Sequence, residues 1–227
     1  MEFTIMMPCL NEEGTVAECI VAAQTYISET KIYADILVVD NGSTDKSAEC
    51  ARKAGAVVVS CPDTGYGNAL RYGIQSATGK YVIFGDCDCS YDFSRLDGFV
   101  KALRSGADVV IGDRFNKNME KGAMSFSHKY IGVPLLSLIG RLAYRTTVHD
   151  FHCGLRGVNK ESFIKLGCKC DGMEFSTEMI GRASGSGCHI EEIPVAFHKD
   201  KRDKSIHWSH LRSIPDGIRH LKLMLKM

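Results

Sequence analysis

The sequence predicts an α/β protein with a Rossmann-like, doubly wound and mostly parallel sheet that carries helices on both faces. Short apolar runs such as 36–39 alternate with helical patterns over the first half of the chain, and the connections between them are short. Continuous apolar strands are typical of parallel sheets, because helices cover both faces of such sheets. Polar turns follow three of these strands, at the sheet edge where open α/β sheets bind ligands.

The first half of the chain carries this alternation most clearly. Apolar runs rich in β-branched and aromatic residues predict strands at 3–8, 36–39, 56–59, 80–84 and 108–112. Helical spacing predicts helices between them, at 11–28, 46–55, 65–79 and 94–104. We expect Asn11 to cap the first helix, with Glu12 and Glu13 in its first turn, where negative charge is favourable. The crossovers should be right-handed.

The alternation breaks in the second half. A polar stretch at 113–129 is long enough to form a mobile loop. The next helix opens near Pro134 and is apolar around much of its girth, so it faces either the core, which we favour, or a bound molecule. We then expect a helix at 174–182, a strand at 189–197 and a basic C-terminal helix. No repeat or linker interrupts the chain, which we interpret as a single domain over residues 1–227.

Composition narrows the possible classes of protein. The 28 basic and 27 acidic side chains leave a net charge of +1, which argues against nucleic acid as a partner. From Lys199 onward, however, eight Lys or Arg face three Asp. We see no secretory signal and no apolar run of the roughly 18 residues that a membrane span needs, so we expect a cytoplasmic protein, soluble or peripheral. The ten cysteines are scattered, which favours reduced thiols.

The acidic segment after the strand at 80–84 is the strongest candidate for chemistry. Asp86 and Asp88 stand at i and i+2, and on an extended segment they would project to the same side. Carboxylate oxygens suit a hard divalent ion, Mn²⁺ or Mg²⁺, that carries a diphosphate. The structural alternative is an Asp-rich turn that caps the next helix.

Two further polar clusters should meet this segment at the same sheet edge. Residues 8–12 follow the first strand, and residues 40–45 follow the second. A carboxylate at Asp40 can accept nucleobase hydrogens or hold a ribose hydroxyl, while a metal on Asp86 and Asp88 bridges the diphosphate. A nucleotide-sugar donor requires both kinds of contact, one to its nucleoside and one to its diphosphate.

Motifs along the chain resemble, in order, those of the family 2 glycosyltransferases, which have the GT-A fold and generally invert the anomeric centre. The matching stretches are 7–13 (MPCLNEE), 38–45 (VVDNGSTD), 65–69 (GYGNA), 85–88 (GDCD) and 112–114 (GDR). Later stretches at 150–157 (DFHCGLRG), 172–175 (GMEF) and 216–221 (DGIRHL) are similar to the dolichyl- and polyprenyl-phosphate branch. The resemblance covers nearly the whole chain.

The resemblance implies a donor site, a metal and an acceptor. The nucleotide-diphosphate-sugar would be bound by Pro8, Leu10, Glu12, Asp40, Gly67, Arg71, Asp86, Cys87 and Asp88. Asp86 and Asp88 would also hold Mn²⁺ or Mg²⁺, with Asp88 the more direct ligand and the third ligand left open. A polyprenyl phosphate would be bound by Arg114, Arg156, Arg202 and Lys204. Residues 1–115 would form the donor-binding half and 116–205 the acceptor-side half, before an amphipathic helix at 208–226.

Two departures from the family pattern bear on the donor site. Leu10 stands where a tyrosine is common, so a ring contact to the base is not expected from this position. Cys89 and Ser90 follow Asp88 where the branch often has a glutamine two positions later.

The acceptor decides which catalytic residues are needed. A phosphate acceptor is already anionic, whereas a hydroxyl acceptor requires a general base. Asp86 and Asp88 are catalytic candidates with either acceptor, because they would hold the metal. For a hydroxyl acceptor, the candidate bases are Glu174 and Asp150, with Glu178 as a weaker choice. Structural alternatives are an ion pair for Arg156, a helix start for Glu174 and a zinc set of His149, His152 and Cys153.

Alternatives also remain for the tail and for the function. Ile218, Leu221 and Leu225 fall on one helical face beside Arg219, so the C-terminal helix lies on an anionic membrane surface or docks onto its own domain. Rival functions are transfer to a soluble or polymer hydroxyl, and non-catalytic nucleotide-sugar binding. A nucleotidylyltransferase would need a glycine-rich loop with Arg or Lys after the first strand, and this loop is missing. No oligomeric state follows from the sequence.

Overall fold

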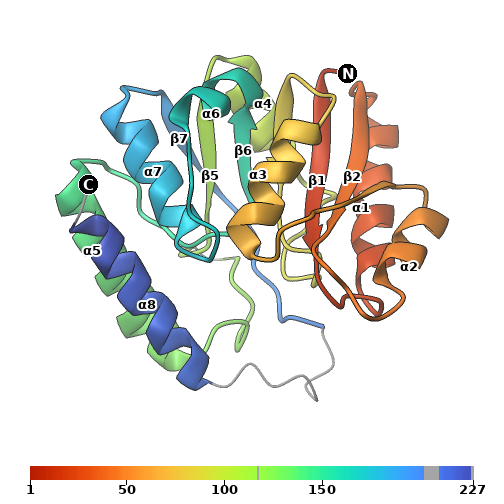
Figure 1. The fold of residues 1–227 in the computed structure, drawn as a ribbon. Coiled ribbons are helices and arrows are strands. Elements are labelled where there is room, and N and C mark those ends of the chain that lie inside the picture. Colours follow the sequence, from red (N-terminus) through yellow and green to blue (C-terminus); the bar gives the residue numbers. More distant parts are fainter. Residues whose placement is uncertain (117, 202–209, 226–227) are drawn as a thin grey trace.

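A seven-stranded sheet forms the centre of the molecule (Figure 1). The computed structural model describes residues 1–116, 118–201 and 210–225. The strands lie in the order β3-β2-β1-β4-β6-β5-β7. Their bounds are β1 (Phe3–Cys9), β2 (Ala34–Asp40), β3 (Val57–Ser60), β4 (Tyr81–Phe84), β5 (Val109–Asp113), β6 (Arg156–Asn159) and β7 (Ile190–Pro194).

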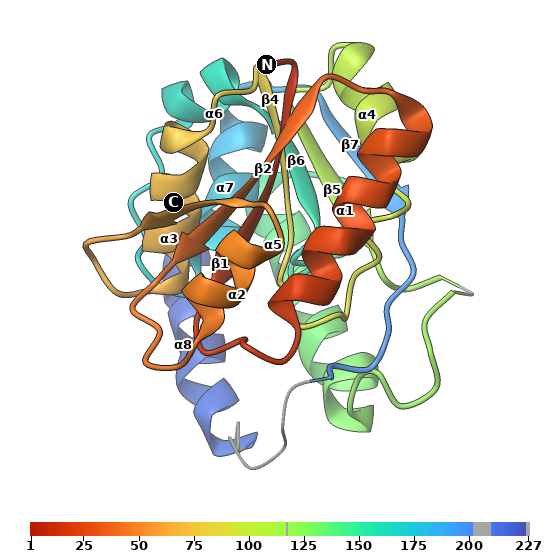
Figure 2. The same ribbon diagram turned by 90° about the vertical axis from the view of Figure 1, so that its right-hand side faces the viewer.

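Helices cover both faces of the sheet. They are α1 (Val16–Thr30), α2 (Ser47–Lys53), α3 (Tyr66–Ser76), α4 (Asp97–Arg104), α5 (Val133–Tyr144), α6 (Lys160–Leu166), α7 (Phe175–Gly185) and α8 (His210–Met224), with a π-helix, η1 (His128–Gly132), before α5. Viewed along the sheet, α1 and α4 lie on one side and α3 and α6 on the other (Figure 2). The expected doubly wound α/β architecture is confirmed.

The strand directions bring the chain's polar turns to one edge. β1 pairs in parallel with both β2 and β4, so the carboxyl ends of these three strands lie together. β6 is antiparallel to both of its neighbours, and its first residue, Arg156, pairs with Phe84 and Ile111. The loop that leads into β6 therefore reaches the same edge. The sequence did not predict the antiparallel direction of β6, nor the short helix α6, whose cap Asn159 accepts from the backbone of Glu161 at 3.0 Å.

The first helix begins later than predicted. α1 starts at Val16, and Asn11 does not cap it, because Asn11 has a φ of 59° in the left-handed region, which asparagine tolerates. The Asn11 side chain instead accepts a hydrogen bond from the backbone N–H of Thr44 at 2.8 Å. It thereby ties the turn after β1 to the turn after β2. The expectation failed because a cap was inferred from local sequence, while the preferred partner lies 33 residues away.

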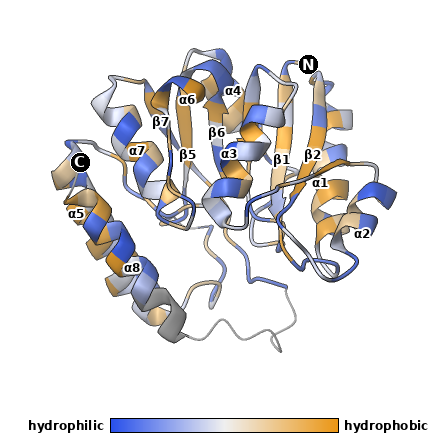
Figure 3. Cartoon of the chain, viewed as in Figure 1, coloured by the Kyte–Doolittle hydropathy of each residue, from blue (hydrophilic) through white to orange (hydrophobic). Residues whose placement is uncertain are grey.

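The expectation that α5 faces the core is wrong. Its buried residues are the small Ser137 and Gly140, while Leu135, Leu138 and Leu142 are 53%, 44% and 74% exposed. The helix packs closely through these small residues, since a Cβ at Gly140 would lie 2.5 Å from a ring carbon of Phe151, and Ile139 and Tyr144 also pack against the core. Figure 3 shows hydrophobic residues along this helix, which lies below the sheet. A helix that is apolar all round does not reveal by periodicity which face is buried.

The C-terminal helix docks onto its own domain. α8 runs beside α5 (Figure 1) and also contacts α7. Its buried residues include His220, whose Nδ1 lies 2.7 Å from Oγ1 of Thr177, and Met224. Ile218 and Leu225 nevertheless remain 47% and 85% exposed. Among the described helices, none combines the length and apolar character that a bilayer span requires.

Candidate active site

Three polar turns converge at the carboxyl ends of β1, β2 and β4. The backbone N–H of Asn41 donates to the carbonyl of Cys9 at 2.9 Å, and the backbone N–H of Glu12 donates to Ser47 Oγ at 2.7 Å. The thiol of Cys87 donates to the carbonyl of Pro8 at 3.2 Å. The predicted meeting of residues 8–12, 40–45 and 86–88 at one edge is therefore confirmed.

The first two turns hold the residues expected at the nucleoside. Glu12 is buried and its Oε2 accepts from Thr15 Oγ1 at 3.0 Å. Asp40 is half-buried and accepts from the backbone N–H of Ser43 at 3.2 Å. Leu10 is 50% exposed at the rim of this turn. These placements bring the residues together, and their contact with a nucleoside stays a prediction.

The acidic segment after β4 bends, so the expectation that it is extended is wrong. Residues 87–91 form a bend, and Cys89 has a φ of 65° in the left-handed region. Asp88 is buried, and its Oδ1 accepts from the backbone N–H and the Oγ of Ser90 at 2.9 and 2.5 Å. The bend arises because this local hydrogen bonding competes with an extended backbone.

Asp86 is held from two directions. Its Oδ1 accepts from the hydroxyl of Tyr66 at 3.0 Å. Burial raises the pKa of this phenol well above its usual value, and the nearby Asp86 carboxylate raises it further, so the hydroxyl keeps its proton and donates. On the other side, a Cβ built on Gly154 would lie 2.4 Å from Asp86 Oδ2. The glycine therefore leaves room for the carboxylate.

The donor set of this segment fits a hard divalent cation. Two carboxylates, Asp86 and Asp88, lie two residues apart in the turn, and Mg²⁺ typically takes one or two carboxylates together with water and substrate phosphates. Within the described residues, no three His, Cys, Asp or Glu side chains cluster in a way that could hold a metal ion. A cation here would therefore depend on the phosphates of its ligand for further coordination.

Gly67 and Arg71 contact a neighbouring loop. The N–H of Gly67 donates to the carbonyl of Asp171 at 2.8 Å. Arg71 donates to the carbonyl of Cys170 at 3.2 Å and pairs with the Asp171 carboxylate at 3.1 Å. A Cβ at Gly67 would lie 2.3 Å from the carbonyl oxygen of Cys170. The structure thus gives both residues a packing role on α3, and their expected donor contact stays a prediction.

Arg114 and Asp150 form a buried ion pair. The guanidinium donates through Nε to Oδ2 at 2.7 Å and through Nη2 to Oδ1 at 2.9 Å. Burial by itself would raise the pKa of Asp150, but its charge pairing and hydrogen bonds with Arg114 lower that pKa below its usual value. A carboxylate so stabilised is a weak proton acceptor, which argues against Asp150 as the general base. Arg114 also lies 5.1 Å from the ring centroid of Phe197.

Arg156 is fully buried and organises the same loop through its backbone. Its guanidinium donates to the carbonyls of Phe151, Cys153 and Ser176 at 2.7, 2.8 and 2.9 Å. Neither the expected phosphate contact nor the alternative of an ion pair describes these bonds. The arginine holds the start of β6 to the first turn of α7, so we assign it a structural role in this conformation.

The candidate bases on α7 differ in their surroundings. Glu178 accepts from the backbone N–H groups of Lys169 and Cys170 and from Arg182. Burial opposes ionisation of Glu178, but these bonds lower its pKa, so it serves as an anchor for the loop. Glu174 stands at the start of α7, and its Oε2 is buried with no hydrogen-bond partner among the described residues. Of the two, only Glu174 keeps a carboxylate oxygen for another ligand.

The three residues of the zinc alternative point to different partners. His149 Nδ1 lies 3.3 Å from an oxygen of Asp113. The ring of His152 packs edge-on against that of His220, with 4.7 Å between centroids. The thiol of Cys153 lies 3.8 Å from the hydroxyl of Tyr91. The structure therefore does not form this zinc set.

The segment after β7 covers the acidic turn. The backbone N–H of Lys201 donates to the carbonyl of Asp88 at 3.0 Å, and that of His198 donates to the carbonyl of Ser90 at 2.9 Å. The Lys201 ammonium pairs with Glu18 on α1. Arg202 and Lys204, predicted to bind phosphate, lie outside the described residues. The described part of the 113–129 stretch contacts this segment, since the Glu120 N–H donates to the Phe197 carbonyl at 2.8 Å.

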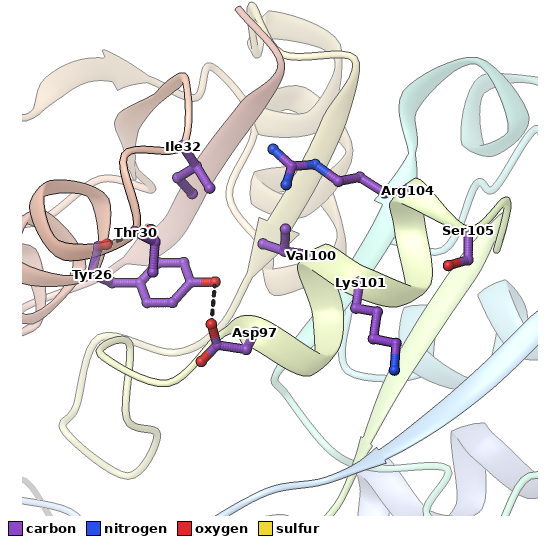
Figure 4. Close-up of a pocket in the computed structure, with 8 residues that line it drawn as sticks. All are labelled: Tyr26, Thr30, Ile32, Asp97, Val100, Lys101, Arg104 and Ser105. Carbon is purple, nitrogen blue, oxygen red and sulfur yellow. Dashed lines mark hydrogen bonds between the residues drawn. The ribbon is translucent and has the colours of Figure 1, made fainter.

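A groove of about 450 Å³ lies elsewhere, between α1 and α4 (Figure 4). It is lined by the last turns of α1 and by one side of α4 along its whole length, and the hydroxyl of Tyr26 donates to Asp97 at 3.3 Å within it. The Arg104 side chain on its wall pairs with Glu2, which precedes β1. This groove therefore lies at the amino edge of the sheet, away from the acidic turns.

Sequence reasoning missed Tyr66 and Tyr91 as site residues. Tyr66 bonds Asp86, and the Tyr91 hydroxyl accepts from the Gly154 N–H at 2.7 Å. Tyr66 stands within the Gly65–Gly67 motif, which was a signal for its importance. Its partner could not be inferred, because the contact forms only when α3 lies across the end of β4.

Comparison with known proteins identifies the family. The family model described as "Glycosyl transferase family 2" matches residues 4–167 of the chain. The chain is 35% identical to the low-salt glycan biosynthesis hexosyltransferase Agl6 of Haloferax volcanii, over 98% of this chain and 52% of that protein. It is 28% identical to a dolichyl-phosphate hexose transferase of the same organism, over 87% of this chain and 83% of that one. The chain spans about half the length of Agl6 and 62% of the glycosyltransferase AglJ.

A solved structure supports the fold. A glucosyl-3-phosphoglycerate synthase from Mycobacterium tuberculosis, crystallised with Mn²⁺ and UDP-glucose, superimposes with a TM-score of 0.74 at 20% identity. The match covers 99% of this chain and 77% of that one. Together with the family match over residues 4–167, this shows that the chain belongs to the family 2 glycosyltransferases and has their GT-A fold.

Proposed function

We propose that this chain is a metal-dependent, inverting glycosyltransferase that moves a sugar from a nucleotide-diphosphate-sugar to a polyprenyl phosphate. Residues 1–115 would bind the donor and residues 116–205 the acceptor within one domain. The protein would work at the cytoplasmic surface of the membrane, where such a lipid is available. Its relative in Haloferax volcanii, the dolichyl-phosphate hexose transferase, supports this choice of acceptor.

The donor side of the proposal rests on the three convergent turns. Glu12 and Asp40 would meet the nucleoside, and Asp86 and Asp88 would hold Mn²⁺ or Mg²⁺ with the diphosphate. The bound cation would neutralise charge on the leaving diphosphate as a Lewis acid. The structure of the mycobacterial synthase, with Mn²⁺ and UDP-glucose, supports a site of this kind on the shared fold.

One observation carries the acceptor side, namely the exposed apolar face that η1 and α5 share. The exposed residues are Tyr130, Ile131, Leu135, Leu138 and Leu142. The opposite face of α5 touches the loop that pairs with Arg114, since Ser137 Oγ accepts from the Phe151 N–H at 3.3 Å. Contiguous exposed apolar residues often mark an interaction site. A polyprenyl tail on this face would have its phosphate directed toward the sheet edge.

The chain's own residues then have defined tasks. The Tyr66 hydroxyl orients Asp86, and the Ser90 backbone and hydroxyl orient Asp88. An anionic phosphate acceptor needs positioning more than deprotonation, and the basic side chains predicted for this role, Arg202 and Lys204, would supply it. This reaction does not require Asp150 or Glu178 as a base, which agrees with their lowered pKa values.

Release of nucleoside diphosphate tests the proposal. Purified protein is assayed with a panel of UDP- and GDP-sugars and Mn²⁺, with and without dolichyl or undecaprenyl phosphate, and the radiolabelled sugar is followed into the organic phase. We expect lipid-stimulated release with one donor and its loss in Asp88→Asn. Donor binding without lipid-stimulated release would overturn the lipid acceptor.

Asp92→Asn is a closely matched control for Asp88→Asn. Asp92 Oδ1 accepts from the backbone N–H and the Oγ of Ser94 at 2.9 and 2.5 Å, the same pattern that Asp88 makes with Ser90. The control thus removes the charge of a carboxylate in an equivalent local turn, outside the acidic turn. If both variants lost activity equally, the loss would reflect turn stability and not a role of Asp88 in the site.

A soluble phosphorylated acceptor is the second candidate. The mycobacterial synthase on the same fold was crystallised with phosphoglyceric acid, and that structure superimposes with a TM-score of 0.72. Transfer to the hydroxyl of such a molecule would need a general base, for which Glu174 is the best-placed residue. Product in the aqueous phase with phosphoglycerate, lost in Glu174→Gln, would favour this candidate.

A further inference from the structure

Two cysteines distant in sequence meet beside the acidic turn. The Sγ atoms of Cys19 and Cys89 lie 3.7 Å apart across 70 residues of sequence. Cys19 comes from the buried face of α1, and Cys89 directly follows Asp88. A disulfide bond is about 2.05 Å long, so closing this gap requires a small movement of the turn together with side-chain rotation.

The backbone directs Cys89 toward α1. Cys89 has a φ of 65°, a conformation that L-residues seldom adopt and that the bonds of Ser90 to Asp88 support on its C-terminal side. The Cys89 thiol also lies 3.9 Å from the carbonyl of Thr15, just before α1. The pair of thiols is therefore a feature of the turn's geometry and does not depend on a flexible terminus.

Lys201 also links the acidic turn to α1. Lys201, whose backbone N–H donates to the carbonyl of Asp88, extends its ammonium to Glu18, the neighbour of Cys19. This ion pair keeps the turn and α1 together. Cys19 is 3% exposed and Cys89 is half-buried, so a small oxidant reaches Cys89 first.

We propose that Cys19 and Cys89 are a reversible modification site, at which a disulfide forms under oxidation and alters the metal-binding turn. A peroxide oxidises the Cys89 thiol to a sulfenic acid and is itself reduced to water. The Cys19 sulfur then attacks the Cys89 sulfur, the S–S bond forms, and a second water leaves with the sulfenic oxygen. Two electrons pass from the sulfurs to the peroxide, and a dithiol reductant reverses the change.

The effect on the turn follows from its position. Closing the bond draws Cys89 toward α1 and carries the adjacent Asp88 with it. Disturbing the groups that orient metal ligands typically lowers metal affinity by about 10–100-fold, so we expect about a tenfold weaker affinity for nucleoside diphosphate with Mn²⁺. This part of the inference rests on the proposed function, whereas formation of the bond does not.

Peptide mapping of the full chain tests the bond. Protein treated with hydrogen peroxide is alkylated, digested and analysed by mass spectrometry. We expect a cross-linked peptide that joins Cys19 to Cys89, absent from Cys19→Ser and Cys89→Ser and present in Cys50→Ser, a half-buried thiol on α2. Because burial raises the pKa of both thiols, oxidation should take longer than for an exposed thiol. Pairing with another cysteine, or a Cys89 oxidised further while Cys19 still alkylates, would overturn the proposal.

Binding measurements test the consequence separately. UDP and GDP affinities with Mn²⁺ are measured by calorimetry on the reduced protein, the oxidised protein and the oxidised protein treated with dithiothreitol. Weakened binding that dithiothreitol restores, and that Cys19→Ser does not show, would support the regulatory effect. A mapped disulfide with unchanged affinity would overturn that effect, whereas reduced protein that binds no nucleotide would count against the proposed function instead.

Discussion

The hydroxyl of Tyr66 lies 3.0 Å from Oδ1 of Asp86 and joins the start of α3 to the turn after β4. This contact links two motifs that are 20 residues apart and gives the carboxylate a defined orientation. The helix α3, which connects β3 to β4, therefore also contributes a residue to the site.

Tyr66→Phe should weaken the site with little effect on the fold. Loss of one hydrogen bond to a charged group corresponds to about 1.5–3 kcal/mol, so we expect an affinity for Mn²⁺ with nucleoside diphosphate that is lower by about ten- to hundredfold. Isothermal titration calorimetry measures this affinity, and Tyr72→Phe on the same helix is the control. Equal affinities for the Tyr66 variant and wild type would show that Asp86 needs no such support.

Gly154→Ala should displace Asp86 from the other side. The added Cβ would lie 2.4 Å from Asp86 Oδ2, so the carboxylate must move. We expect donor affinity to fall at least tenfold, with a smaller change in melting temperature. Gly185→Ala, at the end of α7 where a Cβ meets nothing within 4 Å, should leave affinity unchanged. Normal donor affinity in the Gly154→Ala variant would contradict a functional position for Asp86.

Asp150→Asn should destabilise the protein because it leaves Arg114 charged, buried and without its ion pair. Removal of one partner of a buried pair costs about 3–5 kcal/mol, and urea denaturation measures the loss. Asp113→Asn, at a more exposed neighbour of His149, should cost less than about 1 kcal/mol. If Asp150→Asn were stable but inactive, with an altered pH–rate profile, Asp150 would be the base after all.

Stability should decline as the pH falls below about 6.5, the ordinary histidine value. Burial lowers the pKa of His152 to about 3, and burial also lowers the pKa of His220, so the unfolded chain binds protons that the folded chain does not. Stability is then fully present above pH 6.5 and decreases as the pH falls, for His152 down to about pH 3, by up to about 1.4 kcal/mol per pH unit.

Substitution of His152 isolates this contribution. Urea denaturation at pH 7.5 and 5.0 should show a smaller pH-dependent loss in His152→Phe than in wild type. His189→Phe, at a surface histidine near Glu191, is the control and should behave like wild type. An unchanged pH dependence in His152→Phe would mean that other groups account for acid sensitivity.

The exposed face of α5 should matter for the lipid and not for stability. Leu135→Glu and Leu142→Glu change side chains that are 53% and 74% exposed, so unfolding free energy should shift by less than about 0.5 kcal/mol. Transfer to polyprenyl phosphate should fall about tenfold while donor binding stays constant. Val21→Glu, at a 54% exposed residue of α1, is the control. Unaltered lipid transfer in both leucine variants would exclude this face as the tail-binding surface.

Much of the architecture could be predicted from the sequence because it depends on local patterns. The apolar run 36–39 and its neighbours predicted buried parallel strands, and the turns after β1, β2 and β4 predicted one polar edge. Both are properties of hydrophobic periodicity and strand direction, which a single chain displays without its partners. The helix bounds shifted by a few residues, most at Asn11, where a distant partner outcompeted the local cap.

Tertiary structure alone decided which polar residues act on each other. Arg114 and Arg156 looked alike as candidate phosphate ligands, yet one pairs with Asp150 and the other binds three carbonyls. Likewise, α5 is apolar around much of its girth, and its packing through Ser137 and Gly140 left the leucines exposed. Sequence determines which groups a chain carries and which elements they follow, because those properties are local. The pairing of buried charges and the choice of buried face depend on contacts between distant segments, so only the folded chain decides them.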